Sequence, residues 1–434
     1  MLFPTSHEAA MLANNFSQCV PITGILVSLA TLFKKIKLLP KNTFRRYVSP
    51  IQEKASYTSI NHVVVEGILL PHILPFVIDD EKYLRHNRSK GAALQLTCTV
   101  GSLLLQLILI FKWFQSQKLS SSGGVITENW KQILMMFCAV LFIATCFGLL
   151  HLQRVSKEVV CVLNCSNYSE RKYLEKGFHG YVSYYFIGLA LITIISIAAS
   201  PIALSITTFV KPCMPPAFFT MATLNCKDWN DISGSFLAKA VQSFIAAYTG
   251  LAVFTTPAFG LIVLFLYPVV VQLQLLDGLK RDLESENCYP RMSLLQYRKL
   301  QILSRLHKNA WIDPAVPVVV GGTILLSSTC FYIMLTSSDQ VPLPVLGLFS
   351  IVAFDSIVLI QFLFKIISFP YTKSVDFVNA ARRAIHKVSR WETKFIMSCA
   401  PLRVELGNDT FFDRSTSLSI LKNALDLLVT LLLL

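Results

Sequence analysis

The chain has 434 residues, of which 53% are hydrophobic and 15% are charged, and its mean hydropathy is +0.56. Because soluble domains carry roughly 25% charged residues, this composition excludes a soluble globular protein and indicates an integral membrane protein. The formal net charge of +14 does not indicate a nucleic-acid partner, because the basic residues lie between apolar runs. In such positions they set the orientation of the chain and contact anionic lipid.

Residues 1–91 are predicted to form a cytoplasmic or interfacial segment. Residues 11–33 are mildly apolar, but polar residues and a proline interrupt them. We expect a cytoplasmic or interfacial helix there, with an extra membrane span as the alternative. Residues 62–78 are apolar but short, and they include Glu66, Pro71 and Pro75. This pattern favours an interfacial or partly inserted helix rather than a span.

Seven apolar stretches that follow are long enough to cross a bilayer as helices. They are residues 92–111, 132–152, 181–210, 241–273, 315–335, 343–367 and 416–434. The third contains Pro201, and the fourth contains Pro257 and Pro268, so kinks or extensions beyond the membrane are expected. The sequence therefore predicts an all-α polytopic membrane protein with seven transmembrane helices.

The basic residues predict the orientation of these spans. Of the 39 Lys and Arg residues, 32 lie before span one or in the loops after spans two, four and six, and six lie on the other side. The positive-inside rule then places the N-terminus inside and the C-terminus outside. A G-protein-coupled receptor would need the reverse orientation. The sequons at Asn164 and Asn167 oppose this assignment, since they fall on the predicted cytoplasmic side, but the charge asymmetry is the stronger signal.

The eleven cysteines are scattered and do not describe a disulfide scaffold. Cys213 and Cys226 lie in the connection between spans three and four, which is predicted to be outside. A disulfide there is plausible, and two unpaired cysteines are the alternative. Cys161 and Cys165 have no His nearby, so no metal site is expected. The chain contains no Gly-rich phosphate loop, zinc-protease helix or nucleophile elbow, so we expect neither an enzyme nor a cofactor.

Aromatic residues gather in the predicted outer halves of spans two to six, where they could line an apolar ligand pocket. These ligand-binding candidates are Phe137, Phe209, Phe244, Tyr248, Phe331, Tyr332 and Phe349. The alternative is that they are ordinary aromatic residues facing lipid at the membrane interface.

The last span carries two stripes at alternating spacings of three and four residues. Leu418, Leu421, Leu425, Leu428 and Leu432 form the apolar stripe, and Thr416, Ser419, Asn423, Asp426 and Thr430 form the polar one. A helix of this kind should not face lipid all round, so its polar stripe should meet protein or water. Two interpretations stay open, a buried helix with interhelical hydrogen bonds and a pore-lining helix with Ser419, Asn423, Asp426 and Thr430 toward the pore. Lys422 is the nearby candidate for an ion pair with Asp426.

The segment before this span is basic and amphipathic, and residues 377–395 are predicted to form a cytoplasmic helix that packs with other subunits. The tail reads Ser389-Arg-Trp-Glu-Thr-Lys394, Cys399-Ala-Pro-Leu-Arg-Val-Glu-Leu-Gly407 and Phe411-Phe-Asp-Arg414, and Ile68-Leu-Leu-Pro71 precedes span one. With the inverted seven-span plan, these motifs resemble the insect and other arthropod gustatory and odorant receptors. The gustatory and odorant subfamilies both stay open.

That resemblance implies a ligand-gated, non-selective cation channel of the plasma membrane, used in taste or smell. It implies a homo- or hetero-tetramer around one pore of seventh spans, with a small molecule bound in the outer half of spans two to six. Residues 1–91 would then be the N-terminal segment, 92–367 the six spans with the ligand region, 368–414 the cytoplasmic anchor and 415–434 the pore helix. The alternatives are a secondary transporter or, with reversed topology, a G-protein-coupled receptor.

Overall fold

The structure is a computed structural model of the chain. It describes residues 57–121, 129–173, 181–224, 234–284, 290–311, 314–339, 343–383, 390–407 and 410–433, together with Cys226, Trp229, Asp231 and Val341. The predicted helix at residues 11–33 lies outside these described residues.

Seven helical stretches in the described part of the chain are long and apolar enough to cross a membrane. They are α5 (Lys90–Ser121), α6 (Asn129–Arg154), α8 (Tyr181–Val210), α10 (Phe236–Ala258) continued by η1 (Phe259–Leu266) and α11 (Tyr267–Glu284), α13 (Ala315–Thr336), α14 (Leu343–Val358) continued by η2 (Leu359–Leu363) and α15 (Phe364–Arg383), and α17 (Thr416–Leu433). The predicted all-α, seven-helix membrane fold is therefore confirmed.

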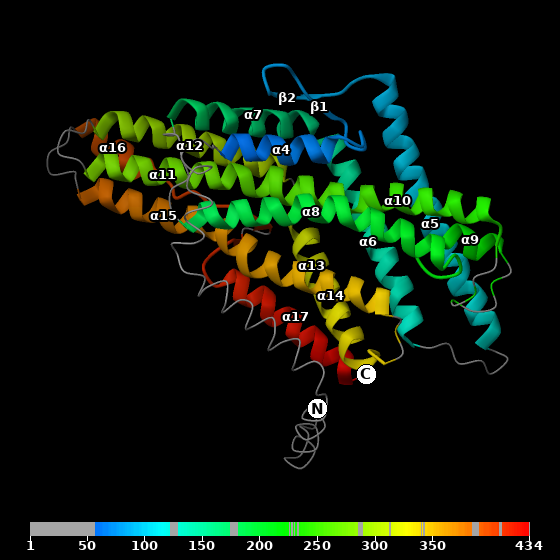
Figure 1. The fold of residues 1–434 in the computed structure, drawn as a ribbon. Helices are drawn as coiled ribbons and strands as arrows, with labels where there is room; N and C mark the ends of the chain where they lie inside the picture. The colour runs from blue at the N-terminus through cyan, green and yellow to red at the C-terminus, as the bar shows by residue number, and fades with distance from the viewer. Residues whose placement is uncertain are drawn as a thin grey trace, which may run out of the picture. The chain divides into compact units, whose positions relative to one another are not determined.

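Two of these helices continue well beyond the predicted ends of their spans. Spans four and six were expected to end at residues 273 and 367, but α11 runs to Glu284 and α15 to Arg383. With α7 (Ser156–Tyr173), α12 (Pro290–Ala310) and α16 (Arg390–Ser398), they gather at one end of the molecule, at the left in Figure 1. We call these five helices the end bundle. Its core is Leu276, Leu279, Tyr297, Leu300, Phe377, Val378, Cys399 and Leu402.

The predicted helix over residues 377–395 is described only in part, because residues 384–389 lie outside the described residues. Phe377 belongs to α15, which is continuous with span six, and a second helix, α16, begins at Arg390. Each of the two helices buries apolar side chains: Phe377 of α15 lies in the core of the end bundle, and Ile396 of α16 is also buried. Helical periodicity alone does not show where a helix is joined to its neighbour.

Residues 62–78, predicted to form a helix, are not a single helix. The helix α4 (Tyr57–Leu69) ends before Pro71 and Pro75, which have no N–H to continue a helix. The chain then forms an antiparallel hairpin of β1 (Phe76–Ile78) and β2 (Leu84–His86), in which Ile78 is opposite Leu84. In Figure 1, α4 lies beside α7, which belongs to the end bundle.

A second hairpin leads into the last span. Strands β3 (Glu405–Gly407) and β4 (Thr410–Phe411) pair antiparallel, and Gly407 has a φ of +119°, a conformation that residues with a side chain rarely adopt. The backbone N–H of Phe412 donates to the carbonyl of Val404 at 2.9 Å. From this hairpin the chain enters α17.

The prolines of spans three and four have different effects. The helix α8 is continuous through Pro201, and α10 packs closely on it at Gly250, where an added Cβ would lie 2.9 Å from Leu204 Cδ1. In span four, by contrast, the eight-residue π-helix η1 lies between Pro257 and Pro268. Span four thus contains a π-helical segment between its two prolines, and the expected extension of the helix is seen in α11, which runs to Glu284.

Pro268 has a direct consequence for the hydrogen bonding of η1. It has no N–H, so the carbonyl of Leu264, four residues earlier, lacks its α-helical donor. His307 of α12 supplies one, because its Nε2 lies 3.1 Å from that carbonyl oxygen. A carbonyl can only accept, so Nε2 carries the proton in this contact.

Candidate functional site

The last helix, α17, has three distinct faces. Its buried face consists of Ser417, Ile420, Ala424 and Leu428 and packs mainly on α13, where the Ser328 hydroxyl donates to the Ala424 carbonyl at 2.7 Å. At about 100° per residue, the polar stripe lies roughly 130° from the centre of this buried face. All four predicted pore residues, Ser419, Asn423, Asp426 and Thr430, are exposed. The third face is apolar and exposed, and it includes Leu418, Leu425 and Val429. It separates the buried face from the polar stripe on the opposite side of the helix.

Among the described residues, the carboxylate of Asp426 has no ion-pair partner. Lys422 and Asp426 are both described and both exposed, and no ion pair joins them. Thr430 donates its hydroxyl to the backbone carbonyl of Asp426 at 2.8 Å, so it does not contact the carboxylate. The ion pair between Lys422 and Asp426 is therefore not formed in the structure of a single chain. The polar stripe faces outward.

The start of α17 is held by a compact cap. Asp413 accepts hydrogen bonds from the Ser415 N–H at 3.0 Å and the Thr416 hydroxyl at 2.6 Å, while its own N–H donates to the Thr416 hydroxyl oxygen at 2.9 Å. These contacts, with that of Thr416 the largest, lower the pKa of Asp413 below its ordinary value. The cap satisfies donors that a helix N-terminus leaves unpaired and fixes the hairpin rigidly to the helix.

The predicted ligand residues do not form one cluster. Phe137 and Phe349 are buried and in edge-to-face contact, with ring centroids 5.2 Å apart. Phe244 is 74% exposed, and Phe209 contacts Phe236 at 5.7 Å. Phe331 and Tyr332 are half-buried neighbours on α13. Within this set, Phe137 and Phe349 are the pair of described residues whose rings meet.

Tyr248 is half-buried and joins α10 to α5 by a hydrogen bond between its hydroxyl and that of Thr99. Thr99 donates its own hydroxyl to the Gln95 carbonyl at 2.9 Å, so Tyr248 must be the donor. The hydroxyl of this ligand-binding candidate is therefore used within the protein.

The connection between α8 and α10 carries features that the sequence only partly predicted. Cys213 and Cys226 are joined by a disulfide, with Cα atoms 5.8 Å apart. In the same connection, Trp229 lies between Trp130, at 5.3 Å, and Trp113, at 6.0 Å. Lys131 lies over the Trp130 and Trp229 rings. Sequence reasoning missed this tryptophan cluster, because its members come from three separate segments.

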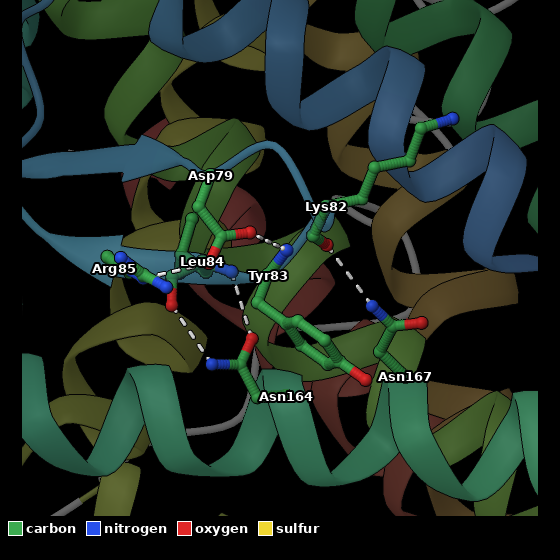
Figure 2. Close-up of polar contacts among 7 residues, drawn as sticks. All are labelled: Asp79, Lys82, Tyr83, Leu84, Arg85, Asn164 and Asn167. Carbon is green, nitrogen blue, oxygen red and sulfur yellow. Dashed lines mark hydrogen bonds and ion pairs between the residues drawn. The ribbon is translucent and has the colours of Figure 1, made fainter.

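The two sequon asparagines hold the β1–β2 hairpin against α7 (Figure 2). Asn164 accepts from the Leu84 N–H and donates to the Leu84 carbonyl, both at 2.9 Å, so its amide extends the edge of β2 as a further strand would. Asn167 donates to the Lys82 carbonyl at 3.3 Å. N-glycosylation would use the same amide nitrogens that make these contacts. The sequons therefore no longer argue against a cytoplasmic position for α7.

A small cavity with both polar and apolar lining lies between α4, α7 and this hairpin. Its lining includes Asn61, His62, Lys82, Asn167 and Tyr267. Burial, reinforced by the positive charges of nearby basic residues, lowers the pKa of His62 below its ordinary value. Among the described residues, no group of three or more His, Cys, Asp or Glu side chains could hold a metal ion.

The fold and the helix faces define the class of protein as a seven-helix, multi-pass membrane protein whose last helix presents an unpartnered polar stripe. No protein-family model matches the sequence, and neither does any curated protein.

Solved structures do match the fold. The insect olfactory receptor OR5 from Machilis hrabei in complex with eugenol aligns with a TM-score of 0.56 and 13% identity, over 87% of this chain and 99% of that one. A structure of the same receptor aligns with a TM-score of 0.54 and 14% identity, over 90% and 98% of the two chains. The chain thus has the fold of an insect olfactory receptor, which confirms at the level of fold the resemblance found in its sequence.

Proposed function

We propose that the chain is a subunit of a chemosensory, ligand-gated and non-selective cation channel of the plasma membrane. In this proposal four subunits surround one pore, which residues 415–434 line. Residues 92–367 form the other six spans with the ligand region, and residues 368–414 belong to a cytoplasmic anchor where subunits meet. The shared fold with an olfactory receptor supports a chemoreceptor role, and the helix faces of α17 support the channel.

The observation that carries the proposal is the exposed polar stripe of α17. An acidic side chain at the centre of a membrane helix costs roughly 2.5–3.5 kcal/mol on insertion scales unless it meets water or a partner. Asp426 is exposed and has no ion-pair partner in the described chain. A water-filled pore between subunits removes that cost, and a ring of acidic side chains around it would concentrate cations.

The end bundle supports assembly with other copies. On α12, Met292, Leu295 and Ile302 are exposed and lie on one helical face, because their spacings are three and seven residues. Nearby on α16, Trp391 is 48% exposed, with Arg291 of α12 over its ring at 5.4 Å. Exposed apolar surface of this kind, outside the bilayer, indicates a protein interface.

The ligand is proposed to be a small, largely apolar molecule. The olfactory receptor of like fold was solved with eugenol, an aromatic molecule with one hydroxyl group. The half-buried ring of Tyr248 provides apolar surface on span four. Eugenol is therefore the first compound of the test panel, followed by other volatile and tastant molecules.

The deciding experiment compares the wild type with Asp426→Asn by patch clamp in asymmetric salt. The variant keeps the size of the side chain and removes its charge, so it should lower the cation-to-chloride permeability ratio and weaken divalent block at normal surface expression. Asp339→Asn, on the exposed connection after α13, is the matched control and should behave as wild type. Identical reversal potentials for wild type and Asp426→Asn would exclude the acidic ring.

The same recordings separate the proposal from a transporter. Unitary current steps that open and close with ligand require a channel, whereas a secondary transporter gives small currents coupled to substrate. A G-protein-coupled receptor requires the reverse orientation, which tags at the two termini of intact cells would detect.

A further inference from the structure

Phe412 lies at the junction between the second hairpin and the last helix. Its side chain is fully buried, and its backbone N–H is fixed to the Val404 carbonyl. The Asp413 cap follows at once and leads directly into α17. A displacement of the Phe412 ring would therefore also move the start of α17.

The Phe412 ring is enclosed by two other buried phenylalanines. It stacks on Phe364, with ring centroids 5.7 Å apart and planes at 25°, and it meets Phe265 edge-on at 6.0 Å. Phe265 lies inside the π-helix η1 of span four, and Phe364 is the residue that closes η2 of span six. Phe412 thus contacts one residue inside η1 and the residue that directly follows η2.

π-Helices are rare and are found mostly at functional sites. When a π-turn reverts to an α-turn, one residue leaves the turn, so that everything beyond it rotates by about 100° and shifts by about 1.5 Å. Such a change in η1 or η2 would carry the ring of Phe265 or Phe364 away from Phe412. The hydrogen bond of His307 to Leu264, four residues before Pro268, holds η1 in its present form.

The neighbouring residue makes unrelated contacts and provides a control. Phe411 is only half-buried, and its ring contacts Tyr371 at 4.6 Å and the Arg403 guanidinium at 4.8 Å. It belongs to the same hairpin as Phe412 but does not touch either π-helix through its ring.

We propose that Phe412 is the positioning residue through which the π-helical segments of spans four and six set the orientation of α17. This inference rests on the proposed function in one respect, that the polar face of α17 is in contact with water in a pore. Phe412 itself lies outside the pore, so it changes how far the polar stripe is exposed to water but not the ion path.

The test measures the water exposure of position 426 in the full-length protein in membranes. Asp426→Cys is reacted with a cationic methanethiosulfonate reagent, and the rate is followed by mass spectrometry of the peptide that contains residue 426. Each aromatic pair contributes a factor of about 2 to 12 in an equilibrium constant, so Phe412→Leu, which loses two pairs, should change the rate by a factor of about 4 to 150. Phe411→Leu should leave it within about twofold, and unitary conductance should not change in either variant.

Equal rates in the Phe412→Leu and Phe411→Leu backgrounds would overturn the inference. Should Phe412→Leu fail to reach the surface, Phe265→Leu and Phe364→Leu each remove one ring contact and should each give part of the change. Unchanged labelling in both would overturn it as well. If position 426 reacts in no background, the water-facing stripe itself fails, and the proposed channel fails with it. If it reacts equally in all of them, only the role of Phe412 is refuted.

Discussion

The clamp between Asn164 and Leu84 offers a quantitative test of the structure. Asn164→Ala removes two hydrogen bonds of 2.9 Å, each contributing about 1 kcal/mol net. Because Leu84 is only 6% exposed, its unpaired N–H and carbonyl add to the loss, and we expect about 2–3 kcal/mol in total. Since 1.4 kcal/mol is a factor of ten, the Leu84 amide should exchange its hydrogen about 30- to 150-fold faster.

The assay is hydrogen–deuterium exchange of the purified protein, read on peptides that cover β2. Asn167→Ala, which loses a single bond of 3.3 Å, is the graded control and should accelerate exchange several-fold at most. Mass spectrometry of the full-length wild type should find no glycan on Asn164 or Asn167, because the hairpin engages both amide nitrogens. A glycan on Asn164 or Asn167, or exchange at Leu84 equal to wild type in Asn164→Ala, would refute the clamp and with it the predicted cytoplasmic position of α7.

Three further outcomes are expected. Tyr248→Ala should raise the half-maximal ligand concentration without changing maximal current per surface channel. Tyr248→Phe, which keeps the ring, should separate the loss of the ring from the loss of the hydrogen bond to Thr99. Wild-type responses of Tyr248→Ala to every active ligand would place the pocket elsewhere. Changing Trp391 and Phe395 together to Asp should abolish assembly while membrane insertion continues, and an intact tetramer on native gels would contradict this. Burial lowers the pKa of His307 to about 4 from its ordinary value near 6.5. Its contribution to stability is therefore complete above about pH 6.5 and is lost as pH falls toward 4, by at most about 3 kcal/mol. His307→Gln keeps a donor for Leu264 and should flatten this part of the stability profile in thermal melts, and an unchanged profile would exclude His307 as its source.

The sequence by itself determined the elements that depend on local composition. A helix in lipid must satisfy its own backbone and present apolar side chains for about 20 residues, and that requirement is visible in any window of the chain. For this reason the seven spans were found where the structure has them, with errors confined to the ends, as at Glu284 and Arg383. The polar stripe of α17 was equally predictable, because spacings of three and four place residues on one helical face whatever surrounds it.

Only the tertiary structure decided how distant residues meet. Nothing local to Asn164 indicates that its amide completes the edge of a strand 80 residues earlier, and a sequon motif pointed to the opposite interpretation. Pro268 predicted an irregular helix in span four, because it has no N–H to donate. The residue that donates to the Leu264 carbonyl instead, His307, comes from another helix. Which of the aromatic candidates meet one another was not predictable for the same reason. The position of a residue along its helix can be counted from the sequence, but the direction of its side chain around the bundle cannot. Phe412 is one of two adjacent phenylalanines in the sequence, and its burial between Phe265 and Phe364 follows from the packing of three spans, which no periodicity encodes.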